Sequence, residues 1–239
     1  MGCEKKLLWR RFLIVLGAFL SLGIPFKVMV LVEGFTEVRP VNTIPPIAGL
    51  ICGPVGALAV GVGNLIADLF GTLSASSVLG FFGNMVAAYL PYRLWHIYSQ
   101  EEPHVHCGKN LIRYVLICFS AAVTVAWILG FGLYYFFGQW IEEIYTYVAY
   151  NNFGFSVGLG LPLFIMLTSD DIKVRCAPGS GKYRLLKNQR LRKILPVIQG
   201  LVMAAILVAV AVFHCSPAAD VWLHVLSAAG LLGLFAILV

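Results

Sequence analysis

The chain has 239 residues, of which 60% are hydrophobic and only 12% are charged, and its formal net charge is +6 at pH 7. Soluble globular domains carry about 25% charged residues, so this composition, with a mean hydropathy of +0.88, excludes an ordinary soluble protein. The longest polar stretch, residues 169–193, is too short to form a soluble catalytic domain. We therefore expect a single integral membrane domain.

The N-terminus carries Lys5, Lys6, Arg10 and Arg11 around the start of the first apolar segment, at about residues 9–32. A secretory signal peptide would end at a small-x-small cleavage site, and this segment has none in a fitting place. We therefore expect the segment to remain in the protein as its first membrane span.

Long apolar segments follow one another along the chain, each near the roughly 20 residues that a helix needs to cross a bilayer. They lie at about residues 9–32, 46–71, 76–95, 112–138, 144–168, 194–214 and 220–239. Fifteen of the seventeen Lys and Arg residues gather at the N-terminus, in residues 93–113 and in residues 173–193. Because basic loops stay in the cytoplasm, these three regions should share one side, which seven simple crossings cannot achieve.

Gly53-Pro54 offers a solution, because it divides the second segment into pieces at about 42–52 and 54–70. The first piece has only about eleven residues, so it must be recessed in protein or lie where the bilayer is thin. A re-entrant segment at 42–71 gives the same parity, but we prefer the split. The sequence then predicts an all-α, polytopic membrane helix bundle of eight segments with both termini in the cytoplasm.

Asn64, Asp68 and Asn84 lie deep inside the apolar tract at residues 41–95. Unpaired polar groups in hydrocarbon are costly, so these side chains must face protein or water. Asn64 and Asp68 are four residues apart and share one helical face. Asn84 follows a glycine, as Asn64 does, and the two amides are expected to meet across an antiparallel pair. A ligand pocket and an interhelical hydrogen-bond network both explain these residues.

Arg39 and Asn42 lie just before the broken helix, in the connection at residues 36–42. Arg39 is one of two basic residues expected away from the cytoplasmic side. Its guanidinium can hold a substrate carboxylate or phosphate through a bidentate contact. An ion pair with Glu33 or Glu37 is the competing explanation.

Tyr150, Asn151 and Asn152 follow Tyr145 and Tyr147 in the fifth long segment. Aromatic rings and amides together can stack on a flat heterocycle and hydrogen-bond to it. An aromatic belt at the membrane interface also explains the tyrosines, but it explains the asparagines less well. We include all three residues of 150–152 among the candidate substrate-binding residues.

The order of elements in this part of the chain resembles a known family. A short helix is followed by Gly-Pro, a Gly-spaced helix with a polar pair, a Gly/Ser loop and a small-residue helix with a basic end. This order is similar to the substrate-binding S components of the energy-coupling factor (ECF) vitamin transporters, over roughly residues 10–168. The likeness is carried by Ile44-Pro45-Pro46, Gly49, Gly53-Pro54-Val55-Gly56, Gly61, Gly63-Asn64, Asp68, Gly71, residues 74–83 and Tyr92-Arg93.

This resemblance implies a six-helix core with both ends in the cytoplasm, in a prokaryotic cell membrane. Such a protein captures a vitamin-like small molecule on the outer side and docks on a transmembrane coupling subunit driven by two ATPase subunits. In the family, small residues of the first helix meet the coupling subunit, and Gly17, Ala18 and Ser21 are the candidates here. The last two segments, at 194–214 and 220–239, depart from the family pattern.

We therefore divide the chain into a substrate-binding core at 1–168, a basic cytoplasmic loop at 169–193 and a C-terminal helix pair at 194–239. The alternative function is a membrane sensor that binds a small ligand. An enzyme acting on lipid is disfavoured because Asp68, the one deep acid, has no acidic or His neighbour in the sequence.

Two further motifs are weak. Residues 176–183 resemble a phosphate-binding loop but have Cys for the first Gly and Tyr for the last Ser or Thr. His104, His106 and Cys107 lack a fourth ligand for zinc. We expect no catalytic residue, no cofactor, no metal and no nucleic-acid partner; the expected partners are the small substrate, membrane lipid and the transport subunits.

Overall fold

The computed structural model describes residues 2–32, 36–71, 73–172, 174–179 and 186–239. A two-stranded antiparallel hairpin, β1 Val30–Val32 with β2 Thr36–Glu37, lies between short 3₁₀ turns at Pro25–Val28 and Pro40–Thr43. All other regular structure in this part of the chain is α-helical. The helices are α1 Gly2–Gly23, α2 Ile44–Cys52, α3 Pro54–Asp68, α4 Ser77–Tyr98, α5 Gly108–Phe137, α6 Glu142–Gly158, α7 Gly160–Thr168, α8 Gln189–Phe213 and α9 Trp222–Leu238.

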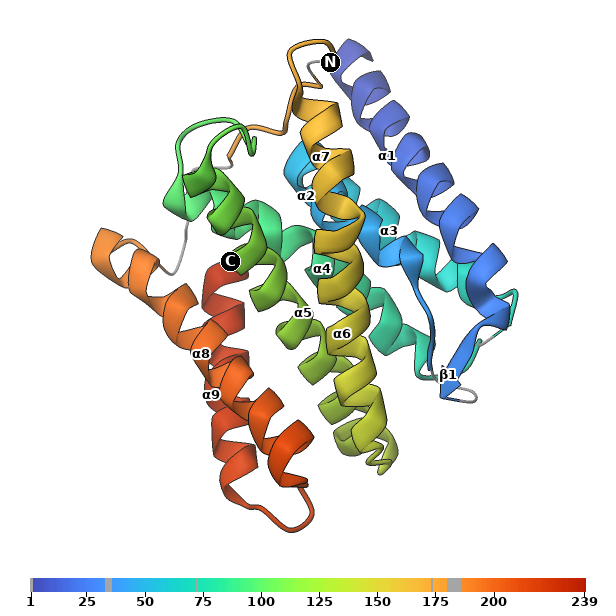
Figure 1. Cartoon of the computed structure of the whole chain (residues 1–239), viewed down its shortest axis with the longest axis vertical. Helices are drawn as coiled ribbons and strands as arrows, with labels where there is room; N and C mark the ends of the chain where they lie inside the picture. The colour runs from blue at the N-terminus through green and yellow to red at the C-terminus, as the bar shows by residue number, and fades with distance from the viewer. Residues whose placement is uncertain (1, 33–35, 72, 173, 180–185) are drawn as a thin grey trace.

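The helices form one elongated bundle with two distinct ends (Figure 1). The N-terminus, the α4–α5 connection and the α7–α8 connection lie at one end, which we call the basic end. The β1–β2 hairpin and the α8–α9 connection lie at the other, the hairpin end. The described residues of the three basic regions thus share one end of the molecule, as the charge pattern requires of a membrane protein.

Length and composition agree with a membrane-embedded fold. Four helical stretches are long and apolar enough to cross a bilayer: Lys5–Val28, Gly108–Phe137, Glu142–Thr168 and Gln189–Phe213. The outward faces of several helices carry large exposed apolar side chains, such as Ile14 on α1 and Val212 on α8. Extended apolar surface of this kind is typical of contact with lipid or with another protein.

The predicted break at Gly53-Pro54 is confirmed, because α2 ends at Cys52 and α3 begins at Pro54. Gly53 has φ +60° and ψ −139°, a conformation that residues with a Cβ rarely adopt. Pro54 stands in the first turn of α3, where its missing N–H leaves no hydrogen bond unmade. All nine residues of α2 are buried, so this short helix is enclosed by protein.

Two predicted segments end or break earlier than expected. The first span, predicted to reach residue 32, ends at Gly23 and passes into the 3₁₀ turn that Pro25 begins. The segment at 144–168 is interrupted at Leu159, between α6 and α7. Pro162 explains this interruption, because it has no N–H to donate to the carbonyl of Gly158 and its ring crowds that carbonyl.

The C-terminal pair α8–α9 joins the rest of the bundle through buried polar contacts as well as apolar packing. The amide of Gln199 donates to Thr124 on α5 over 3.0 Å, and the indole of Trp127 donates to Ser227 on α9 over 3.0 Å. The guanidinium Nε of Arg93, near the end of α4, donates to the carbonyl of Ile237 over 2.9 Å. Position 93 therefore connects α4 to the last turn of α9.

Helices α2 and α4 approach each other very closely at Gly49. A Cβ atom added at Gly49 would overlap the backbone carbonyl of Ala88, so only glycine fits there. We expect Gly49→Leu to force the helices apart and lower the free energy of unfolding by about 1–3 kcal/mol or more. Unfolding in a mixed-micelle SDS titration measures this change.

Gly17→Leu provides the matched control, since a Cβ at Gly17 meets nothing within 4 Å. We expect its unfolding free energy to stay close to that of the unmodified chain. Equal destabilisation by both substitutions would contradict the close α2–α4 packing.

Candidate functional site

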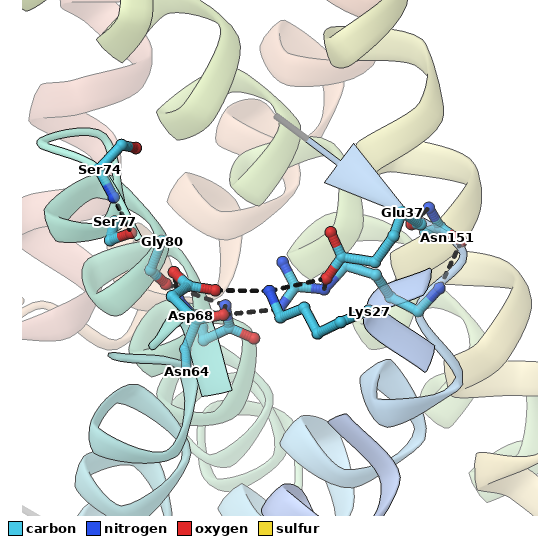
Figure 2. A network of polar contacts seen from close by, with 10 residues as sticks. Lys27, Glu37, Asn64, Asp68, Ser74, Ser77, Gly80 and Asn151 are labelled. Carbon is cyan, nitrogen blue, oxygen red and sulfur yellow. Dashed lines mark hydrogen bonds and ion pairs between the residues drawn. The ribbon is translucent and has the colours of Figure 1, made fainter. Parts of the chain in front are cut away.

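A cluster of buried charged and amide side chains lies at the hairpin end of the bundle, between α1, the hairpin, α3, α4 and α6 (Figure 2). We call it the polar cluster. It consists of Lys27, Glu37, Arg39, Asn64, Asp68, Asn84 and Asn151.

Lys27 stands between two carboxylates at the centre of the polar cluster (Figure 2). Its Nζ lies 2.7 Å from Oδ1 of Asp68 and 3.0 Å from Oε1 of Glu37. The three side chains are between 5% and 8% exposed. Charges withdrawn from water to this extent persist only where they are paired, and here each carboxylate has the ammonium as its partner.

Asn64 connects the ion pairs to α4 and to Arg39. Its amide nitrogen donates to Oδ2 of Asp68 over 3.1 Å, and its oxygen accepts from Nη2 of Arg39 over 2.6 Å. The same oxygen accepts from Nδ2 of Asn84 over 3.0 Å, and Asn84 also donates to the carbonyl of Gly80 over 2.9 Å. The predicted approach of the two amides across an antiparallel pair, α3 and α4, is thus confirmed.

Arg39 has spare capacity for hydrogen bonding. Its Nε lies 3.7 Å from Oε1 of Glu37, which is an ion-pair distance, but this buried atom has no hydrogen-bond partner among the described residues. The expected pairing with Glu37 is therefore present, while Glu33 lies outside the described residues. A guanidinium has five N–H donors, so Arg39 can hold further acceptor groups.

Asn151 on α6 holds the strand segment in place. Its amide nitrogen donates to the backbone carbonyl of Glu37 over 3.0 Å, and its oxygen accepts from the backbone N–H of Arg39 over 3.3 Å. A single side chain therefore fixes the backbone on both sides of residue 38. Nearby, the hydroxyl of Ser156 donates to the carbonyl of Asn42 over 3.1 Å.

The polar cluster lines a cavity of about 50 Å³. Lys27, Glu37, Arg39, Asn64 and Asp68 form its polar wall. The remaining lining residues are Ser76, Ser77, Leu79, Gly80, Leu129, Leu133, Ile144 and Val148. A buried water needs roughly 10–15 Å³ measured in this way, so the cavity has room for a few water molecules, and a larger ligand requires the wall to move.

Gly80 lies against the polar cluster from α4. A Cβ atom added there would stand 2.6 Å from Nδ2 of Asn64 and 3.8 Å from Oδ2 of Asp68. The absence of a side chain at this position therefore lets α4 approach the amide and carboxylate closely.

The predicted substrate-binding residues divide into two groups. Arg39, Asn64, Asp68, Asn84 and Asn151 come together in the polar cluster, whereas the other three do not join it. Asn42 is buried, but its Nδ2 has no hydrogen-bond partner in the described structure. Asn152 donates to the carbonyl of Val148 in its own helix, and Tyr150 is 70% exposed on the outer surface of α6.

Lys27 is the cluster residue that the sequence analysis did not single out, and Glu37 entered it only as a partner for Arg39. The available signal was position: Lys27 and Arg39 are the only two basic residues outside the three basic regions. A lysine at the end of an apolar segment commonly extends to the membrane interface. Its pairing with Asp68, 41 residues away, depends on tertiary structure.

The residues predicted to meet a coupling subunit lie on α1 at a largely outward face. Ser21 is exposed, and its hydroxyl donates to the carbonyl of Ala18 over 2.9 Å. Ala18 is half-buried and packs against the core. A Cβ at Gly17 would meet nothing within 4 Å, so this part of α1 has a shallow, open surface.

The two weak motifs hold no assembled site in the described structure. No group of three or more His, Cys, Asp and Glu side chains among those residues stands close enough to hold a metal ion. His104 contacts Asn110 and Glu101. Burial raises the pKa of the Cys176 thiol to about 12, so this thiol is protonated at neutral pH. Residues 180–183 of the loop-like motif lie outside the described residues.

The comparisons with known proteins identify no relative: no family model, no curated protein and no solved structure matches the chain. The resemblance to the S components of ECF transporters therefore stays a prediction from the sequence.

The ion pairs of the polar cluster predict a specific pattern of stability. Lys27→Met leaves two carboxylates without their ammonium in a buried site, and we expect a loss of about 3–5 kcal/mol in unfolding free energy. Asp68→Asn should lower it less, because Lys27 keeps Glu37 as a partner. Mixed-micelle SDS titration again provides the measurement.

The pair formed by His214 and Glu142 is the control, because its 2.7 Å distance is the same but its side chains are 74% and 30% exposed. We expect Glu142→Gln to change the free energy of unfolding by no more than about 1 kcal/mol. Equal effects of Lys27→Met and Glu142→Gln would contradict a desolvated ion pair at Lys27.

Proposed function

We propose that the protein is the membrane-embedded substrate-binding subunit of an ECF-type importer, and that the polar cluster binds a small, polar, vitamin-like micronutrient. The observation that carries this proposal is the buried set of two acids and two bases around a cavity, at the end of the bundle opposite the basic regions. The sequence resemblance supplies the transport class.

The energetics of the polar cluster favour a functional role over a purely structural one. Desolvation of paired charges offsets most of their attraction, and apolar side chains of similar volume stabilise a fold as well or better. Ionisable residues inside a membrane domain are for this reason most often found where a protein binds or conducts polar molecules. Lys27, Glu37, Arg39 and Asp68 together fit that pattern.

The orientation in this proposal follows from charge. With the basic end in the cytoplasm, both termini lie inside and the polar cluster faces the outer side, where an import protein meets its substrate. Segments α1 to α7 form the six-segment core, in which α6 and α7 count as one crossing. The pair α8–α9 is an addition to that core.

The chemistry of the polar cluster indicates a ligand of matching character. Asp68 and Glu37 offer carboxylates, Lys27 and Arg39 offer cations, and their formal charges cancel. A ligand with both donor and acceptor groups can replace the internal ion pairs without leaving a charge unpaired. Entry of such a ligand requires the side chains of Glu37 and Arg39 to move, because they line the small cavity. Their backbone is held to α6 by Asn151.

In this proposal the energy for uptake comes from two separate ATPase subunits through a transmembrane coupling subunit. The exposed surface of α1 around Gly17 and Ser21 is the docking surface for that subunit. Small residues allow close approach of helices in a membrane, and the open space at Gly17 supports this assignment.

The most direct test is native mass spectrometry of the protein released from nanodiscs. We expect a bound small molecule of reproducible mass in the unmodified protein. Asp68→Asn should reduce its occupancy at least tenfold, since a lost charged hydrogen bond typically weakens binding by that factor or more. Asn152→Ala is the control, because that amide bonds only within its own helix in the described contacts.

Two outcomes would overturn the proposal. A ligand retained equally by Asp68→Asn and the unmodified protein would place binding away from the polar cluster. Affinity purification from native membranes that recovers neither ATPase nor coupling subunits would contradict the transport role even if a ligand is found.

The proposed orientation can be tested with the protein's own cysteines. Cys107 is exposed in the α4–α5 connection, and Cys215 is partly exposed in the α8–α9 connection at the opposite end. In variants that keep one of these two thiols alone, a membrane-impermeant maleimide added to intact cells should label Cys215. It should label Cys107 only after permeabilisation, and the reverse pattern would invert the proposed topology.

A further inference from the structure

A large apolar groove lies far from the polar cluster, at the basic end of the bundle. It has a volume of about 640 Å³ and runs between α5 and α8, with the end of α4 as its floor. Both α5 and α8 begin at this end, at Gly108 and Gln189. The groove is lined by the first turns of α5 and by α8 from Pro196 onward.

The mouth of the groove is positively charged and its depth is apolar. Lys109 and Arg113 lie in the first two turns of α5 and line the groove together with Tyr98. Further along, the walls are made of side chains such as Leu116 and Leu201. The N-terminus of α5 adds partial positive charge to the mouth, because its first backbone N–H groups are not used within the helix.

A polar group without a partner lies within the groove. Ser120 lines it about two helical turns beyond Arg113, roughly 10 Å along α5. The residue is only 9% exposed, and its buried side-chain Oγ has no hydrogen-bond partner in the described structure. Buried hydroxyl groups nearly always have a partner, so an acceptor from another molecule fits this position.

We propose that this groove is a binding site for one anionic phospholipid. Lys109 and Arg113 hold the phosphate, an ester carbonyl accepts from Ser120, and an acyl chain lies along the apolar walls. The order of chemical groups along the groove is the same as in the lipid: charge at the surface, an acceptor below it, then hydrocarbon. Basic sites between helices on the cytoplasmic side of a membrane are known to take anionic headgroups.

In this proposal the lipid binds at the junction between the predicted core and the C-terminal helix pair. The lipid would fill the space between α5 and α8, which are otherwise joined deeper in the bundle by Gln199 and Thr124. The proposal does not depend on the substrate or on the transport role of the polar cluster.

The experiment is a titration of delipidated, full-length protein with phosphatidylglycerol and with phosphatidylcholine of the same acyl chains, read by native mass spectrometry. We expect one phosphatidylglycerol to bind first and more tightly. Lys109→Gln with Arg113→Gln should weaken phosphatidylglycerol binding on the order of tenfold and leave phosphatidylcholine unchanged. Lys109→Gln alone tests the same point if the double variant does not fold, since Arg113 also contacts Asn110 and Trp95.

Two further variants separate the groove from the general lipid-facing surface. Gly200→Leu places a side chain beside Ser120, where a Cβ would already stand 3.5 Å from the hydroxyl oxygen, and it should reduce the binding of both lipids. Gly154→Leu is its control, because a Cβ at that position on α6 meets nothing within 4 Å. Lys5→Gln with Lys6→Gln controls for loss of charge elsewhere at the basic end.

Three results would overturn the proposal. Equal affinity of the unmodified protein for the two lipids would show an ordinary lipid-facing surface. Unchanged phosphatidylglycerol binding in the Lys109 and Arg113 variants would place the headgroup elsewhere. A dimer mass in place of bound lipid would identify the groove as a contact between two copies of the chain.

Discussion

The pairing of Lys27 with both Asp68 and Glu37 is the constraint on which the hairpin end of the molecule depends. One ammonium joins three parts of the chain: the turn after α1, the end of strand β2, and the end of α3. Arg39, Asn64 and Asn84 extend this network to α4, and Asn151 extends it to α6. Because a buried charge cannot be left alone, movement of any one of these elements requires a new partner for the groups it leaves.

The fold could be predicted where local sequence determines the backbone and where charge constrains the topology. Gly53 and Pro54 each disfavour continuation of a helix, so the boundary between α2 and α3 was readable from two residues. The hairpin was missed because residues 28–32 are all apolar and read as a continuation of the first apolar segment. The interruption at Leu159 was missed although Pro162 was visible, because proline is common within membrane helices and often bends them without ending them.

The candidate site was predictable where its members share a helix or a repeated pattern. Asn64 and Asp68 are four residues apart, and the equivalent setting of Asn84 indicated the contact across α3 and α4. Periodicity does not show which face of α6 turns inward, so Asn151 was grouped with Tyr150, whose ring is 70% exposed. Lys27 needed the three-dimensional path of the chain after α1, which no spacing in the sequence encodes.

In the proposed membrane orientation, the shortness of α2 sets the depth at which the charged side chains lie. The continuous helical stretch Pro40–Cys52 is well below the roughly 20 residues of a full crossing, and at about 1.5 Å per residue the shortfall amounts to about 10 Å of thickness. Arg39 immediately precedes this stretch, so its guanidinium and the neighbouring polar side chains lie in the part of the bilayer thickness that the short helix does not span. In the proposed transport role, a polar cavity at that depth would shorten the path a solute must travel through the protein to the opposite face.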